Sequence, residues 1–199
     1  HDAAINVMRR LIQSSGAEVI HLGHDQSAKA VVDCAIQEDA HAVALTSYQG
    51  GHVEYFTYIR QLLDEAGCEH VRIFGGGGGT ITPPEIRTLH QSGISKIYSP
   101  DDGRTMGLMG MIHHLMGLAS EVDLIGKERT ASLNGPVTPE DMAKVGLLLT
   151  LSESADEKTF KAAVEACRSS DKDVPVIGFT GTGGCLLYTS DAADEHSCV

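Results

Sequence analysis

Five consecutive glycines, at positions 75–79, restrict the fold of this chain more than any other feature. Glycine costs about 1 kcal/mol per residue in a helix relative to alanine, and it weakens the interior of a strand. The run therefore predicts a loop, and it directly follows the short apolar segment 71–74. A second glycine cluster, Gly50 and Gly51, follows the apolar segment 42–46 after three residues. Seven of the 22 glycines thus lie behind two apolar segments.

Helix and strand patterns alternate along the first 118 residues. Apolar residues at helical spacing predict helices at 4–12, 30–36, 53–66 and 104–118, and Thr82 followed by two prolines predicts the start of another. Short apolar runs predict strands at 18–22, 42–46, 71–74 and 96–98. This alternation is typical of an α/β domain with a parallel sheet. Ligands bind beyond the carboxyl ends of such strands, which is where both glycine clusters fall.

The net charge is strongly acidic, because 27 Asp and Glu stand against 15 Lys and Arg and give −12. Binding to nucleic acid phosphates needs clustered basic side chains, so we expect no nucleic acid partner. No segment approaches the roughly 18 apolar residues of a membrane helix, so we expect no membrane partner either. The five cysteines show no C-x-x-C spacing. This argues against a disulfide framework or a zinc ribbon and predicts a reducing, cytoplasmic location.

The character of the chain changes after residue 120. Residues 121–173 predict a helical linker, in which Thr138 caps a helix that opens at Pro139 and a second helix covers 158–168. Residues 174–185 predict a strand followed by the first five positions of a P-loop, a phosphate-binding loop. The lysine that would contact the phosphates is missing, so we expect no nucleotide site. Residues 186–199 match no expected element and are interpreted as a non-native tail.

Three small motifs stand at defined distances from one another. His1 opens the chain, Thr46-Ser47-Tyr48 follows the segment 5–45, and Gly75-Gly76 follows the segment 49–74. This order and spacing resembles the cobalamin-binding domains of methylmalonyl-CoA mutase, glutamate mutase and methionine synthase, whose pattern is Asp-x-His-x-x-Gly, Ser-x-Leu and Gly-Gly. The sequences SYQGGHVEYF, FGGGGG and IYSPDDG are most similar to the fused isobutyryl-CoA mutases. The resemblance covers residues 1–118 and resumes at 174–185.

The resemblance implies a flavodoxin-like parallel sheet in the strand order 2-1-3-4-5, with helices on both faces and residues 1–120 as the cobalamin-binding domain. Its first strand would precede His1 and is missing from the chain. In the fused mutases this domain precedes a GTPase chaperone domain and the barrel that binds the acyl-CoA substrate. The implied reaction is the adenosylcobalamin-dependent rearrangement of isobutyryl-CoA to n-butyryl-CoA by a homodimer. GTP and Mg²⁺ would bind only the longer parent.

The resemblance also assigns residues to the cofactor. His1 would be the axial ligand of cobalt, replacing the cofactor's own dimethylbenzimidazole, and the displaced nucleotide tail would enter a slot beside the sheet. Thr46 would supply a hydroxyl near the base of that tail, and glycines would leave room for it. No residue of this chain is assigned to catalysis. The implied cofactor-binding residues are His1, Asp2, Thr46, Ser47, Tyr48, Gly50, Gly75, Gly76, Gly77, Tyr98 and Ser99.

Several interpretations stay open. His52 is equally compatible with a contact to the corrin ring and with a helix-start residue held by backbone. A stand-alone corrinoid carrier for methyl transfer and a flavodoxin-like regulatory module without cobalamin are alternative functions. The aspartate that should stand two residues before His1, and the strand before it, are absent from the chain. We therefore expect the 199 residues to fold poorly and to bind cobalamin weakly.

Overall fold

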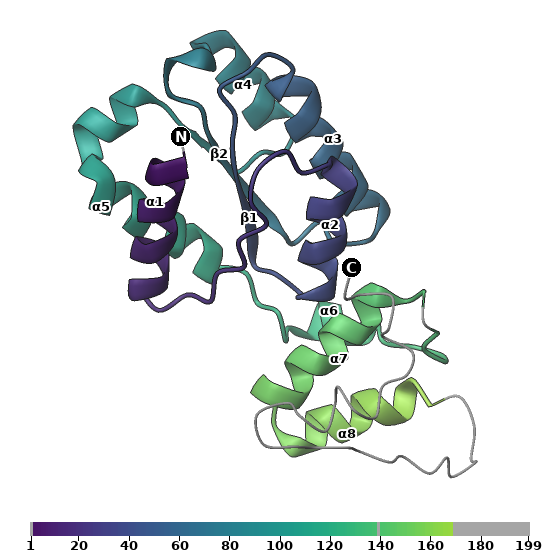
Figure 1. Cartoon of the computed structure of the whole chain (residues 1–199). Helices are drawn as coiled ribbons and strands as arrows, with labels where there is room; N and C mark the ends of the chain where they lie inside the picture. The colour runs from purple at the N-terminus through teal and green to yellow at the C-terminus, as the bar shows by residue number, and fades with distance from the viewer. Residues whose placement is uncertain (1, 139, 169–199) are drawn as a thin grey trace, which may run out of the picture. The chain divides into compact units, whose positions relative to one another are not determined.

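Three short parallel strands form the sheet of this protein (Figure 1). The computed structural model describes residues 2–138 and 140–168, with side chains from residue 5 onward. The strands lie in the order β1-β2-β3, with bounds Ala42–Thr46, Arg72–Gly76 and Lys96–Tyr98. Their register places Thr46 opposite Gly76, and Gly76 opposite Tyr98. The predicted parallel α/β class is therefore confirmed, and β1, β2 and β3 take the places of the third, fourth and fifth strands of the flavodoxin-like order.

Helices cover both faces of this sheet (Figure 1). On one face lie α2, α3 and α4, with bounds Ala28–Gln37, His52–Glu65 and Pro83–Gln91. Their apolar side chains, together with Ile73 and Ile97 of the strands, form the largest hydrophobic core. On the other face lie α1 (Asp2–Ser14) and α5 (Pro100–Ser120). Phe74, Tyr98 and Leu115 form a smaller core between the sheet and α5.

Local capping residues explain where these helices begin. Ser27 caps α2 by accepting a hydrogen bond from the Ala30 amide. Thr82 and Glu85 form a capping box at α4, and Ser99 forms another with the third residue of α5. Because of this second box, α5 begins at Pro100 and not at the expected residue 104. A left-handed Gly107 interrupts α5 after its second turn.

The strand predicted at 18–22 is wrong. These residues have no regular secondary structure, and the side chains of Ile20 and Leu22 are 47% and 37% exposed. In the order 2-1-3 such a strand pairs only with the first strand, and no such neighbour exists among the residues that the structure describes. An apolar run without a ladder partner gains no hydrogen bonds from being extended. For the same reason β1 has an unpaired outer edge within the described sheet.

Three further helices follow the sheet domain. They are α6, α7 and α8, with bounds Lys127–Ala131, Met142–Ser154 and Glu157–Ala166. Of these, α7 and α8 pack around their own small core, to which Leu147, Leu151 and Ala163 contribute. Helices therefore follow residue 120, among them α6, which sequence reasoning missed, while the linker bounds 121–173 stay a prediction. The predicted opening of a helix at Pro139 is also wrong, since α7 begins at Met142. Thr138 still donates from its amide and its hydroxyl to the Asp141 carboxylate, as in a capping box, but the helix starts only after Asp141.

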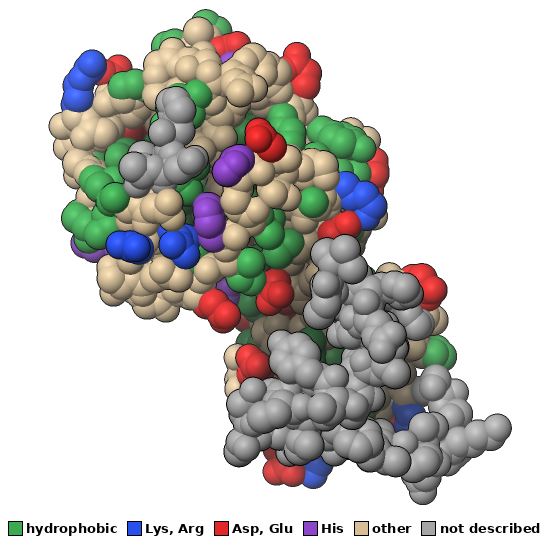
Figure 2. All heavy atoms as spheres, in the orientation of Figure 1, with side chains coloured by type: hydrophobic (Ala, Val, Ile, Leu, Met, Phe, Trp, Pro, Cys, Tyr) green, Lys and Arg blue, Asp and Glu red, His purple; other side chains and the backbone are tan. Residues whose placement is uncertain are grey.

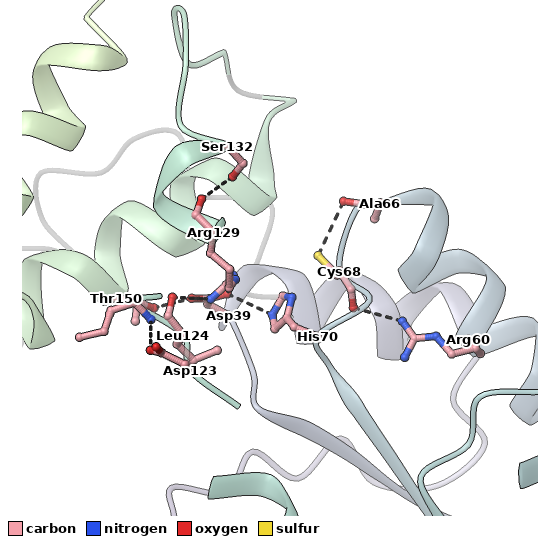
Figure 3. A network of polar contacts seen from close by, with 11 residues as sticks. Asp39, Arg60, Ala66, Cys68, His70, Asp123, Leu124, Arg129, Ser132 and Thr150 are labelled. Atoms are coloured by element: carbon pink, nitrogen blue, oxygen red, sulfur yellow. Dashed lines mark hydrogen bonds and ion pairs between the residues drawn. The ribbon is translucent and has the colours of Figure 1, made fainter. Parts of the chain in front are cut away.

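A buried polar network joins this helical segment to the sheet domain (Figure 3). Asp39, just after α2, is 5% exposed and forms an ion pair with Arg129 of α6. The same carboxylate accepts a hydrogen bond of 2.8 Å from the Thr150 hydroxyl of α7. Gly146 allows α7 to come this close, since a Cβ there would lie 2.8 Å from the Ile36 carbonyl oxygen. The network therefore fixes α6 and α7 against the end of α2.

The surface is charged but shows no basic concentration on the side seen in Figure 2. There, Lys and Arg side chains are scattered among acidic ones, in keeping with the acidic net charge. Within the described residues, none of the helices combines the length and apolar character that crossing a membrane requires. The predicted strand and partial P-loop at 174–185, and the tail 186–199, lie outside the described residues.

Candidate functional site

Two glycine loops lie together at the carboxyl edge of the sheet. Because the strands are parallel and in register, the loop after β1 (residues 47–51) and the loop after β2 (residues 77–82) leave the sheet side by side. The pairing continues one residue past the strands, where the Ser47 amide donates to the Gly76 carbonyl oxygen at 2.9 Å. Both glycine clusters are thus brought to one place, as the sequence predicted.

The sheet is open toward α1 and α5 next to these loops. Side chains alternate along a strand, so Val43 and Leu45 of β1 pack into the large core while Ala44 and Thr46 point to the other face. Both Ala44 and Thr46 are exposed, although the sheet has helices on both sides. Gly76, opposite Thr46, adds to this opening, because a Cβ there would meet nothing closer than the Tyr98 carbonyl oxygen at 3.8 Å. We call the space beside Ala44, Thr46 and Gly76 the hollow.

Different neighbours explain why glycine is needed at different positions of the run. A Cβ at Gly75 would lie 2.5 Å from a methyl of Ile97 and 2.7 Å from the Phe56 ring, so this glycine permits α3 to pack on the sheet. A Cβ at Gly77 would lie only 2.1 Å from the Ser47 carbonyl oxygen, so this one permits the loops to touch. Only Gly76 borders the hollow. Roles of Gly75 and Gly77 toward a ligand stay predictions, since packing alone requires both.

A buried histidine at the start of α3 contacts the first loop and the residues that follow the second loop. His52, the first residue of α3, is 5% exposed, and its Nδ1 lies 3.0 Å from the Gln49 carbonyl oxygen. Its Nε2 forms an ion-pair contact of 3.3 Å with Oε1 of Glu85 in the first turn of α4. The hydrogen bonds from Thr82, and then the contact with His52, hold the pKa of Glu85 below its usual value. Of the two interpretations of His52 left open by the sequence, the structure agrees with the helix-start residue held by backbone.

Residues 1–100 match the family model of the B12 binding domain. This chain belongs to the B12-binding domain family. Relatives include the fused isobutyryl-CoA mutases of Geobacillus kaustophilus, 47% identical over 92% of this chain, and of Nocardia farcinica, 50% identical over 92%. The 2-hydroxyisobutanoyl-CoA mutase small subunit of Aquincola tertiaricarbonis is 32% identical over 51% of this chain and 73% of its own length. The chain spans 17% of the length of the fused mutases it matches. The predicted resemblance is thus confirmed.

The residues that border the hollow of this B12-binding domain are small. A planar or chain-like group beside the sheet needs small residues on the strand face, and Ala44, Thr46 and Gly76 are small. A Cβ at Gly76 would point into the same space. Sequence reasoning missed Ala44, yet a signal was present: β1 reads AVALT, in which small residues alternate with the larger Val43 and Leu45.

Tyr98 and Ser99 of the B12-binding domain are both engaged by protein atoms. The Tyr98 hydroxyl lies 2.9 Å from Nδ1 of His114 on α5, with the two rings edge to face. Burial, followed by the charge of Asp102, raises the pKa of Tyr98 to about 12, so the phenol stays protonated. The Ser99 hydroxyl is used in the capping box of α5, where it accepts from the Asp102 amide. Their predicted roles toward the cofactor therefore stay predictions.

The structure describes some of the remaining predicted site residues in full and others only in part or not at all. His1 lies outside the described residues, and only the backbone of Asp2, the first residue of α1, is described. Gly50 is exposed, and a Cβ there would meet nothing within 4 Å. Tyr48 is 43% exposed, and its ring lies 3.5 Å from the position of a Cβ on Gly78, so it borders the glycine run. The carboxyl edge thus brings together Thr46, Ser47, Tyr48, Gly50, Gly76 and Gly77.

Proposed function

We propose that this chain is the cofactor domain of an adenosylcobalamin-dependent acyl-CoA mutase that converts isobutyryl-CoA to n-butyryl-CoA. The names of the relatives support this proposal, since the fused isobutyryl-CoA mutases match 92% of the chain. The observation that carries it is the hollow. There the strand residue Ala44 is exposed, although helices lie on both faces of the sheet. A parallel sheet with an open face at its carboxyl edge is where a ligand of this fold binds.

The residues of the chain would bind and orient the cofactor rather than react. Thr46 would offer its hydroxyl to the nucleotide tail, and Gly76 would leave space for it. His1 would ligate cobalt through a ring nitrogen, a ligand type that suits first-row transition metals. When bound, adenosylcobalamin supplies the radical chemistry of the rearrangement, and the protein supplies its position. The acyl-CoA site would belong to another part of the parent enzyme.

Filling the hollow tests this placement. In the full chain, Ala44→Leu places a large side chain on the open face of β1, so we expect at least a tenfold weaker binding of adenosylcobalamin, about 1.4 kcal/mol. The matched control is Ala30→Leu, at an exposed position of α2 on the other face of the sheet. Absorbance titration gives the Kd of each variant. Equal Kd values for Ala44→Leu, Ala30→Leu and the unaltered chain would contradict the proposal.

The cobalt ligand is tested by isotope labelling. Nitrogen-14 splits the electron paramagnetic resonance lines of bound cob(II)alamin into triplets, and nitrogen-15 splits them into doublets. Protein labelled with nitrogen-15 should therefore give doublets, because the ligand nitrogen comes from His1. Persistent triplets would show that the cofactor keeps its own base and would exclude His1. His1→Ala should abolish the protein-derived splitting, whereas His24→Ala, at an exposed loop residue, should leave it unchanged.

Other parts of the proposal concern the parent enzyme. We expect a GTPase domain to use GTP and Mg²⁺ there and the parent to form a homodimer in the cytoplasm. The stand-alone corrinoid carrier is the weaker alternative, since the relatives reported above are named as mutases. The regulatory module without cobalamin is set aside, because the chain belongs to the B12-binding domain family.

A further inference from the structure

The loops after β1 and β2 are connected at two places. Near the sheet, the Ser47 amide donates to the Gly76 carbonyl oxygen. Farther out, His52 lies between the Gln49 carbonyl oxygen of the first loop and Glu85, which follows the second loop. We call this second connection the histidine clasp. His52 is 5% exposed, whereas the Glu85 side chain is 37% exposed, so the clasp is buried at its histidine and open to water at its carboxylate.

The partners of His52 determine which of its ring nitrogens donates a hydrogen bond. The Gln49 carbonyl can only accept, so Nδ1 must donate the hydrogen in the 3.0 Å contact. Glu85 is occupied on one side, where Oε2 accepts from the Thr82 amide at 2.7 Å and the Thr82 hydroxyl at 2.6 Å. Its Oε1 faces Nε2 at 3.3 Å. His52 therefore contacts the first loop through one ring nitrogen and the start of α4 through the other.

The clasp lies behind loops whose outer surface is partly main chain. A Cβ on Gly50, Gly51 or Gly79 would meet nothing within 4 Å, while Tyr48 and Gln49 expose side chains beside them. The glycine positions offer no side chain that could rotate to adapt to a ligand. The fit of the loops to a rigid ligand therefore depends on the distance between them. His52 connects them, because it contacts Gln49 of the first loop and Glu85, which follows the second loop.

We propose that His52 is a positioning residue for cobalamin, because the histidine clasp sets the spacing of the two glycine loops at the carboxyl edge. The proposal rests on the proposed function, which places the cofactor at this edge. His52 itself would not touch the cofactor, since its side chain is 6% exposed and both of its nitrogens face protein atoms. Its effect passes through Gln49 and Glu85 to the loops.

The test separates positioning from general stability. His52→Asn keeps a donor for the Gln49 carbonyl but does not reach Glu85, whereas His52→Gln places an amide nitrogen near the former Nε2. The matched control is His70→Asn, at a half-buried histidine before β2 and therefore at the opposite edge of the sheet. Adenosylcobalamin titration and thermal unfolding without cobalamin are measured on the full chain for each variant. Amide hydrogen exchange is measured without cobalamin as well.

The expected result is a tenfold higher Kd for His52→Asn, a smaller rise for His52→Gln, and a Kd within twofold of the unaltered chain for His70→Asn. Exchange should increase at 49–51 and 77–82 in His52→Asn and in Glu85→Gln but not in His70→Asn. Glu85→Gln keeps the His52 side chain and should also raise the Kd, which covers the case that His52→Asn does not fold. Unchanged exchange in both loops, or equal Kd rises for His52→Asn and His70→Asn, would overturn the proposal. Failure of the unaltered chain to bind cobalamin would instead refute the proposed function, while exchange still decides whether the clasp ties the loops.

Discussion

At the scale of single residues, Gly77 allows the two loops to touch next to the strand ends, whereas the histidine clasp acts farther out. Its missing Cβ would lie 2.1 Å from the Ser47 carbonyl oxygen, a backbone atom that cannot move without shifting the strand end. We expect Gly77→Ala to destabilise the protein by about 1–3 kcal/mol, because overpacking against backbone forces a displacement. Gly79→Ala, where a Cβ would meet nothing within 4 Å, is the control and should change stability by less than about 0.5 kcal/mol. Urea unfolding of the two variants distinguishes these outcomes, and equal stabilities would contradict the prediction.

His70 should make stability depend on pH. Burial, followed by the charge of Arg129, lowers the pKa of His70 to about 4, although Asp39 at 3.7 Å and Glu69 act in the opposite direction. The unfolded chain therefore binds the proton more readily than the folded one between about pH 6.5 and 4. The stability contributed by neutral His70 is complete above this window and is lost as the pH falls through it.

We expect the free energy of unfolding to fall by about 2 kcal/mol from His70 alone between pH 7 and pH 5. Urea unfolding at both pH values measures this change. His70→Gln should reduce it, since glutamine does not titrate. An identical pH dependence in His70→Gln and in the unaltered chain would show that another group is responsible.

At the scale of elements, Asp39 holds the helical segment on the sheet domain (Figure 3). Asp39→Asn removes the charge that pairs with Arg129, while asparagine still tolerates the positive φ of this position. Because Arg129 is 17% exposed and would lose its carboxylate, we expect a loss of about 2 kcal/mol and faster amide exchange in α7.

Asp33→Asn is the control for Asp39→Asn. Asp33 pairs with Lys29 at the surface, where both side chains are largely exposed, so its loss should cost less than about 0.5 kcal/mol. Amide exchange followed by mass spectrometry reports α7 in both variants. If α7 exchanges equally in the two, the helical segment is held by its apolar contacts and not by Asp39.

Sequence predicted elements well where the deciding residues are close together. Thr82 directly precedes the helix that it caps, so α4 begins where expected. The strand expected at 18–22 failed, because its formation depends on a partner strand and not on its own apolar pattern. The histidine clasp could not be predicted from the sequence for the same reason, since it also depends on a distant partner. Glu85 stands 33 positions after His52, and only the packing of α3 beside α4 brings the two together.

At the scale of the whole molecule, the described sheet ends at β1. Its outer edge carries backbone groups without strand partners, and Ala44 on its open face is exposed. We expect the 199-residue chain to melt at a lower temperature and to bind cobalamin more weakly than a version extended at its N-terminus by a designed β-strand ending in Asp-x. Calorimetry and absorbance titration compare the two proteins. Equal melting temperatures and Kd values would contradict this expectation.

The family of the domain followed from a resemblance in its motifs, whereas the cobalt ligand did not follow from the structure. Thr46, Tyr48 and Gly76 reach one edge of the sheet because strand lengths and parallel order convert sequence distance into position. His1 has no such support, since it lies outside the described residues. Its role therefore depends on the labelling experiment.

The bare glycine surface has a consequence for mutagenesis. Scanning by alanine finds important residues by removing atoms, but Gly50, Gly51 and Gly79 contribute by having none to remove. A conventional scan of this edge would therefore report a silent region around the binding site. The informative experiment is the reverse scan, in which each glycine receives progressively larger side chains until the ligand is displaced. The largest side chain tolerated at each position would show how closely the bound molecule approaches the backbone there.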